Sequence, residues 1–429
     1  MVGLFFFQKS SSIHVPVIFA QHWIPMIARS ILTGCLLMLA CIILPDRGAA
    51  QTPASVRFDP DQGVVIKQDS IFETIFRFRI QDRATFLSQN GSDLHVASAA
   101  WQVRRCRLKF EGFAITPRLK YQLQLGLSDF DQAIADGTGD QSILMDAFIR
   151  YALSPKLEVG FGETKLPGDR QSIISSGYQE FPERSIATNA FTLDHDFGFH
   201  VDWRIATGRQ PLRLHAAVSQ GEGRSSRSSG DGLCYTGRLE WLPLGAFTKE
   251  GDYSEGDLAR EKTPKLALAT AYSTNIDAQR AFAQRGLRFP DDMTRTINTF
   301  FADVLYKYNG WSFSNQFQQR HADDDPVVRD TVSLTQVAVN EGWGATSQLG
   351  KMVSKRTEVS VRYSIFKPAE SIEENLPRRE DAWLGWSYYI NGHRIKLQSA
   401  LIYTWLDGVP DLVHQGDQWG LMFQVEFGI

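Results

Sequence analysis

The sequence predicts an all-β protein, a transmembrane antiparallel β-barrel of about 16 strands with one long loop folded inward. Three observations support this fold class. Apolar and polar side chains alternate along many segments, short and long connections alternate between those segments, and a secretory signal precedes them. A β-sheet that crosses a membrane must close on itself, because lipid cannot satisfy the hydrogen bonds of an open strand edge.

The alternation is clearest near the end of the chain. Ile395, Leu397 and Leu401 share one face of a strand, while Arg394 and Lys396 share the other. Successive side chains of a strand point to opposite faces, so this strand has one apolar face and one charged face. Segments with this pattern are predicted at 72–87, 96–111, 118–128, 143–153, 156–165, 195–207, 211–220, 232–242, 264–276, 296–309, 311–321, 342–351, 355–367, 382–391, 393–406 and 417–427.

The connections between these segments differ in length in a regular way. Asn309-Gly310 and Asn391-Gly392 are short turns, since Asn-Gly suits the positive φ angles of a tight hairpin. Connection 243–263 is long where a short turn is expected. Long connections are predicted at 88–95, 129–142, 166–194, 221–231, 277–295, 322–341, 368–381 and 407–416.

Tryptophans lie near the ends of many predicted segments. Aromatic rings gather at the two boundaries between membrane and water, so these residues are expected to form girdles around the barrel. They are Trp101, Trp203, Trp241, Trp311, Trp383, Trp405 and Trp419.

The N-terminal part has the features of a secretory signal. Translation is expected to start at Met26; Arg29 then supplies the positive charge, residues 31–44 are apolar, and the small residues 48–50 precede a cleavage site before Gln51. The predicted division is a leader with its signal peptide over 1–50, a mature N-terminal segment over 51–69, and an outer-membrane β-barrel over 70–429.

The composition narrows the function. The net charge is -3, with 45 Lys and Arg against 48 Asp and Glu, so the chain lacks the basic surplus of nucleic-acid-binding domains. The common motifs of hydrolases, zinc proteases and nucleotide-binding proteins are absent from the sequence. We therefore expect no enzymatic activity, no cofactor and no metal site.

The side chains opposite the apolar face are expected to line the barrel interior, and basic ones outnumber acidic ones. The seventeen basic residues are Arg77, Arg79, Arg83, Arg105, Arg107, Lys109, Lys120, Arg150, Lys156, Arg204, Arg213, Arg238, Lys307, Arg320, Arg362, Arg394 and Lys396. The nine acidic residues are Glu73, Glu111, Asp146, Glu158, Asp202, Glu240, Asp303, Glu358 and Glu426. A lining of one sign attracts counter-ions, which favours an anion pore.

From this set we predict the residues that bind a passing anion. Loop 166–194 is long and partly apolar, so it is expected to fold into the barrel and constrict it. The predicted pore-lining residues are Arg77, Arg79, Arg105, Arg107, Lys109, Lys120, Arg150, Arg204, Arg362, Arg394 and Lys396. The predicted cations of the constriction loop are Lys165, Arg170 and Arg184.

Several short motifs resemble the phosphate-selective porin O and P family. They are Arg-Arg-Cys-Arg-Leu at 104–108 with Gly112, Asp-Ala-Phe-Ile-Arg-Tyr at 146–151, Gly-Glu-Thr-Lys-Leu-Pro at 162–167, Glu-Arg-Ser at 183–185, Asp-His-Asp-Phe-Gly at 194–198, Arg-Tyr-Ser at 362–364, and Tyr-Tyr-Ile-Asn-Gly-His at 388–393 with Lys396-Leu397. The resemblance implies a sixteen-stranded barrel that forms a homotrimer, with the loop after the fifth strand inside the pore and Arg and Lys along the path of an anion.

The predicted function is passive, anion-preferring diffusion across a bacterial outer membrane, with phosphate or polyphosphate among the solutes. The expected partners are membrane lipid, small anions and two further copies of the chain, and not nucleic acid. Two alternatives remain open from the sequence: an outer-membrane barrel enzyme that acts on lipid, and a secreted β-rich adhesin or binding protein.

Overall fold

The computed structural model describes residues 53–60, 62–132, 142–226, 232–329, 336–374, 376–407 and 416–429. The chain divides into two compact units, Met1–Pro53 and Ala54–Ile429, and the description below concerns the second. The predicted signal peptide lies outside the described residues. None of the helices in the described part is long and apolar enough to span a membrane.

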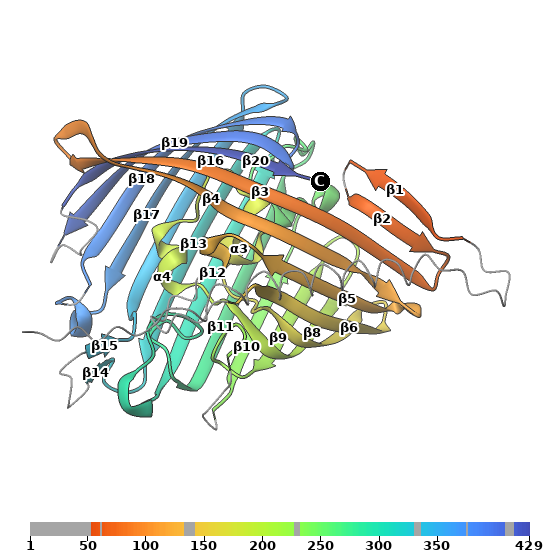
Figure 1. Cartoon of the computed structure of the whole chain (residues 1–429), viewed down its shortest axis with the longest axis horizontal. Helices are drawn as coiled ribbons and strands as arrows, with labels where there is room; N and C mark the ends of the chain where they lie inside the picture. Colours follow the sequence, from red (N-terminus) through yellow and green to blue (C-terminus); the bar gives the residue numbers. More distant parts are fainter. Residues whose placement is uncertain are drawn as a thin grey trace, which may run out of the picture. The chain divides into compact units, whose positions relative to one another are not determined.

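The second unit is a closed antiparallel barrel of 16 strands (Figure 1). Each strand pairs with the next, and the last strand returns to pair with the first. The barrel strands are β3 (Phe72–Asn90), β4 (Asp93–Ala114), β5 (Thr116–Gly126), β6 (Leu144–Ser154), β7 (Leu157–Lys165), β8 (His195–Ala206), β9 (Leu212–Ser219), β10 (Cys234–Trp241), β11 (Lys265–Ala278), β12 (Arg295–Tyr308), β13 (Trp311–Ala322), β16 (Gly342–Met352), β17 (Thr357–Pro368), β18 (Arg378–Asn391), β19 (Ile395–Asp407) and β20 (Gln418–Gly428).

All sixteen predicted segments correspond to barrel strands, so the predicted fold class is confirmed. One predicted connection is wrong. Residues 88–95 are not a long loop, because β3 and β4 continue through them and pair as far as Asn90 and Asp93. The strand extensions leave only the turn Gly91-Ser92 between them.

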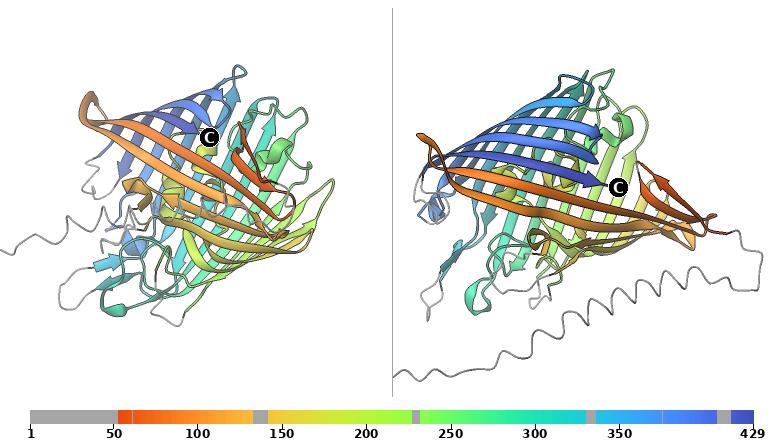
Figure 2. Two further views of the ribbon diagram at one scale, coloured as in Figure 1. Left: turned by 45° about the vertical axis from the view of Figure 1, so that its right-hand side comes forward. Right: turned by 45° about the horizontal axis from the view of Figure 1, so that its top comes forward.

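Two extra strands continue the sheet beside the start of β3 (Figure 2). They are β1 (Ser55–Asp59) and β2 (Gly63–Gln68). β2 pairs with the first five residues of β3, whereas β20 pairs with a later part of the same edge, Arg79–Leu87. Between the two, Ile429 and Phe78 exchange backbone hydrogen bonds of 2.9 and 3.4 Å. One edge of β3 thus pairs with β2 from the N-terminal side of the chain and with β20 from the C-terminal side.

The barrel presents apolar side chains outward and polar side chains inward. Leu384 and Trp386 on β18 are exposed on the outer face, while Ser387 between Trp386 and Tyr388 is buried inside. The girdle prediction was wrong for Trp383, which is buried in the interior. Side chains alternate along a strand, so the odd-numbered Trp383 lies on the other face of β18 from the even-numbered Leu384 and Trp386.

The β3–β4 hairpin extends beyond the strand that follows it (Figure 1). The ladder between β4 and β5 ends at the pair Arg107 and Gly126. From there to Asp93, β4 continues past the end of β5, and its side chains as far as Val103 are exposed, Trp101 by 76%.

The connections carry short helices and one small hairpin. These elements are α2 (Asp129–Gln132), α3 (Arg170–Ile173), η1 (Ser176–Tyr178), α4 (Ile186–Phe191), η2 (Thr248–Tyr253), η3 (Pro290–Asp292), η4 (Glu370–Ile372), and the paired strands β14 (Val327–Arg329) and β15 (Gln336–Ala338).

Candidate pore and its lining

Residues 166–194, the constriction loop, fold into the barrel and pack against its far wall. Phe181 is buried beside Trp383, with their rings 5.8 Å apart and edge to face. The wall has glycines where the loop comes closest. A Cβ atom on Gly350 would lie 2.1 Å from the Glu180 carboxylate, and one on Gly385 would lie 2.5 Å from the Phe181 ring. The wall sequence therefore leaves room for this loop.

A single carboxylate, Glu183, ties the loop to β3 and β4. Its Oε2 atom lies 2.8 Å from Arg83 Nη1 and 2.5 Å from Arg104 Nη2, and its Oε1 atom lies 3.1 Å from Arg105 Nη2. We refer to Arg83, Arg104 and Arg105 as the arginine triad. Burial disfavours the charged form of Glu183, but the triad outweighs burial and holds the Glu183 pKa well below its usual range.

Two cations that were expected to line the pore bind the backbone of the constriction loop instead. Arg362 donates to the Glu183 carbonyl at 2.8 Å, and Lys396 donates to the Gln179 carbonyl at 2.7 Å. Both side chains are buried, and the Arg362 guanidinium also stacks on Phe181 at 4.6 Å. They face the interior, as side-chain alternation predicts, but they hold the loop.

A second loop enters the lumen from the opposite end of the barrel. It is the unexpectedly long connection between β10 and β11, residues 242–264, which we name the second luminal loop. Glu255 meets the constriction loop: its amide donates to the Tyr178 carbonyl at 2.8 Å, and its Oε2 accepts from the Glu180 amide at 2.9 Å. Lys307 on the wall donates to the Gly251 carbonyl at 2.7 Å. The two loops together fill the side of the interior next to β12–β18.

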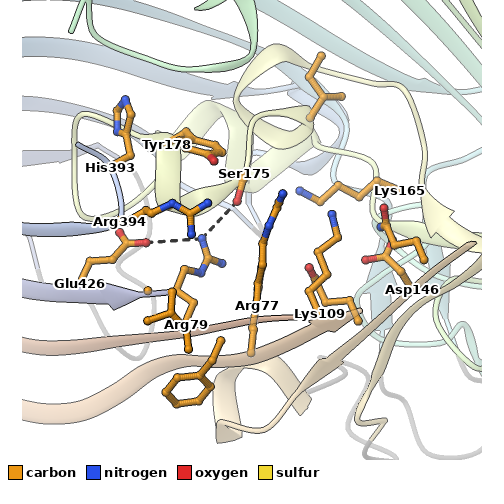
Figure 3. A pocket seen from close by; sticks show the side chains of 18 of the residues that line it. Arg77, Arg79, Lys109, Asp146, Lys165, Ser175, Tyr178, His393, Arg394 and Glu426 are labelled. Atoms are coloured by element: carbon orange, nitrogen blue, oxygen red, sulfur yellow. Dashed lines mark hydrogen bonds and ion pairs between the residues drawn. The ribbon is translucent and has the colours of Figure 1, made fainter. Parts of the chain in front are cut away.

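The open space lies on the other side of the interior, beside β3–β7 and the end of β20. A cavity of about 300 Å³, which we name the basic cavity, lies between these strands and the constriction loop (Figure 3). Its lining includes six cations, Arg77, Arg79, Arg107, Lys109, Lys165 and Arg394, and two carboxylates, Asp146 and Glu426.

Most cations of the basic cavity have an acidic neighbour. Arg77 and Lys109 share Glu111, at 2.9 and 2.6 Å. Arg79 lies 3.7 Å from Glu426 and also donates to hydroxyl groups of the constriction loop, while Arg107 pairs with Asp131 at 2.6 Å. Because one carboxylate is shared by Arg77 and Lys109, and the lining has more cations than acids, the cavity is positive overall.

Two further cavities, of about 280 and 460 Å³, continue toward the end where the second luminal loop enters. The first shares Thr164 and Lys165 with the basic cavity, and both are lined by Arg150 and Tyr253. The three spaces follow one side of the barrel from the constriction loop to the short-turn end. They form one side of the interior between the constriction loop and that end.

The remaining predicted cations have different surroundings. Lys120 pairs with Glu158 and Arg150 with Asp202, at 2.5 and 3.5 Å, and Arg204 is an exposed residue of the 460 Å³ cavity.

The three predicted cations of the constriction loop are engaged within the protein. Arg170 pairs with Asp303 at 2.6 Å, Arg184 donates to the Gln171 carbonyl at 2.8 Å, and Lys165 donates to the Ser172 carbonyl at 2.6 Å. Of the three, Lys165 also lines the basic cavity.

Arg104 faces the interior although strict alternation assigns it to the outer face. The ladder pairs Gln81 with Arg105 and then Asp82 with Val103, so Arg104 is an extra residue in a β-bulge. Its guanidinium lies 3.2 Å from the centre of the Phe130 ring and contacts Glu183. The doubled Arg-Arg sequence was the only available signal for it.

Within the described ranges, no group of three or more His, Cys, Asp or Glu side chains is arranged to hold a metal ion. The arrangement that the structure does offer is a row of charged cavities beside an anchored loop. A closed barrel with such a space in its interior is the architecture of an outer-membrane porin.

Comparison with known proteins identifies the family. The model of the phosphate-selective porin O and P family matches residues 76–334, and the chain belongs to this family. A search among curated proteins gave no matching sequence.

Solved structures share the fold at low sequence identity. An anion-selective porin from Comamonas acidovorans is similar with a TM-score of 0.52 and 10% identity, over 83% of this chain and 99% of that porin. OmpT, an outer-membrane protein of Vibrio cholerae, is similar with a TM-score of 0.51 and 8% identity, over 85% of this chain and 100% of OmpT.

Proposed function

We propose that this porin conducts small anions passively, with phosphate and polyphosphate among its solutes and with no chemical step. The observation that carries this proposal is the positive lining of the basic cavity. An anion that enters it meets more cations than carboxylates between low-dielectric walls, which raises its local concentration over that of a cation. The family name and the anion-selective porin of similar fold support the same reading.

Removing two cations from the cavity is expected to reduce anion preference. Arg77 and Lys109 line the cavity and are partly exposed, so Arg77→Gln with Lys109→Gln changes its charge by two units without burying a carboxylate. The reversal potential in a KCl gradient should move toward that of a non-selective pore, more strongly at low salt, where screening is weaker. Arg118→Gln with Arg356→Gln removes two exposed charges outside the cavity and serves as the matched control. A cation-selective wild-type channel would contradict the proposed function.

We propose that the functional unit is a homotrimer in the outer membrane. The exposed edge of β4 between Asp93 and Val103 supports an oligomer, because an open strand edge is unfavourable in lipid and attracts a further partner. Chemical cross-linking of the protein in detergent should yield a ladder that ends at three subunits. A ladder that stops at the monomer would count against this assembly.

We propose that export removes residues 1–50, with translation beginning at Met26 and the mature chain starting with the segment 51–69 ahead of the barrel. The charge, apolar run and small residues of the leader support cleavage before Gln51. Mass spectrometry of the protein from outer membranes should find an N-terminus within a few residues of Gln51. A chain that retains residues 31–44 would refute the cleavage.

A further inference from the structure

We propose that the basic cavity prefers organic anions with an aromatic body, whose ring packs on Tyr178 while the carboxylate lies among the wall cations. This inference rests on the proposed function and specifies its substrate class. The proposal starts from a contrast in the cavity lining. The strands and the turn before β19 supply the cations, whereas the constriction loop supplies Ile173, Ser175 and Tyr178 and no charged side chain (Figure 3).

Tyr178 is the central residue of the aromatic side. It ends η1 at the tip of the constriction loop, and 38% of the residue is exposed inside the lumen. Its backbone is held from two directions, since its amide donates to the Ser175 carbonyl at 2.8 Å and its carbonyl accepts from the Glu255 amide at 2.8 Å. The backbone that carries the ring is therefore anchored, and the ring is open to a solute. A large aromatic side chain held in this position offers a flat face for a second ring.

Two neighbours extend this surface. The His393 ring lies edge to face with Tyr178, with the ring centres 5.2 Å apart, and Ile173 lines the same cavity. Burial, together with nearby Lys396 and Lys307, lowers the pKa of His393 well below its usual range, so the imidazole is neutral. Tyr178, Ile173 and the neutral His393 therefore form an apolar surface, and Arg394 of the same turn as His393 is the cation beside it.

The opposite side binds the charged end of such a solute. Arg77 and Lys109 share one carboxylate, and the Glu426 carboxylate near Arg79 is also close to the buried Lys396, so the three cavity cations keep a partial positive charge between them. A single carboxylate suits this modest excess. An inorganic anion would interact only with the cations, whereas an aromatic carboxylate would also bury apolar surface against Tyr178. A cavity of about 300 Å³ is at the lower end of the size range of small-molecule sites, which fits one ring with one carboxylate.

The test is block of the chloride current in a planar bilayer by three probes: benzoate, acetate and inorganic phosphate. Wild-type channels should be half-blocked by benzoate at a concentration about tenfold below that of acetate or phosphate. Tyr178→Ala should remove most of this difference, and Tyr178→Phe should retain it, because the ring and not the hydroxyl makes the contact. Tyr235→Ala is the matched control, since Tyr235 is a similarly exposed tyrosine on β10 whose position in the strand places it on the outer face.

The outcomes separate this inference from the proposed function. Equal block by benzoate and acetate in an anion-selective wild-type channel would overturn the aromatic preference and leave the porin's anion preference intact. Unchanged benzoate block in a folded Tyr178→Ala channel would also overturn it. A cation-selective wild-type channel would overturn the proposed function itself. Heat-modifiable mobility on a denaturing gel verifies that each variant forms a barrel.

Discussion

Glu183→Gln is expected to destabilise the barrel strongly and to release the constriction loop. The substitution removes the one carboxylate that the arginine triad shares and leaves buried cations without compensation. Breaking a buried ion pair from one side costs about 3–5 kcal/mol. The temperature at which the folded band disappears on a denaturing gel should fall, and the single-channel current should become noisy as the loop moves.

Glu180→Gln is the matched control, because it makes the same change three positions earlier in the same loop. Burial, together with Glu358 and Glu255, raises the Glu180 pKa well above its usual range, so the carboxyl favours its neutral form. A carboxyl whose pKa is raised in the folded state makes the folded protein less stable as pH rises through that pKa. A carboxyl whose pKa is lowered stabilises the folded protein, and this stabilisation is lost only when pH falls through the lowered pKa. At pH 8, Glu180→Gln should therefore be at least as stable as wild type, whereas Glu183→Gln should show its full loss of stability. Equal effects of the two changes would contradict these assignments.

Shortening the second luminal loop is expected to increase the single-channel conductance at least twofold. Residues 242–264 occupy part of the interior and meet the constriction loop through Glu255. Replacing residues 246–261 by a short Gly-Ser link should open the side of the lumen next to β12–β18, where water would then solvate Lys307. Anion preference should persist, because the cations on β3 and β4 remain.

A milder variant tests the same loop without a deletion. Glu255→Ala removes its carboxylate contacts with the Glu180 amide and with Gln171 and Gln348, and it should produce flickering between conductance levels. Glu374→Gln, an exposed charge outside the lumen, should leave the current steady. An unchanged conductance in the folded deletion variant would mean that the loop does not narrow the path.

The strands could be predicted because the membrane imposes a strict alternation on them. Each barrel strand has a lipid side and an interior side, so the sequence repeats every two residues, as it does along β19. Prediction failed where the structure interrupts this period. The bulge at Arg104 turns two consecutive arginines inward, and the extended β3–β4 hairpin removes a loop that polar residues suggested.

The site was harder to predict because alternation gives the face of a residue but not its partner. Arg105 was expected beside the solute, and it faces the interior, but it is only 1% exposed and contacts Glu183. Its partner is 78 positions away in a loop that has no periodic signal. The second luminal loop was noticed only as an irregular length, and its contact with Tyr178 depends on how two distant loops meet inside the barrel.

From the shared edge of β3 we infer an order of barrel assembly. β2 is a near neighbour of β3 in sequence, so their pairing closes a short loop at little entropic cost. β20 must find the same strand from the far end of the chain, and Gln81 and Glu426, which touch across this seam, are 345 positions apart. Contacts of such long range form late. We therefore expect the N-terminal hairpin to extend β3 before β20 docks, so that the arrival of the last strand converts an open sheet into a sealed cylinder.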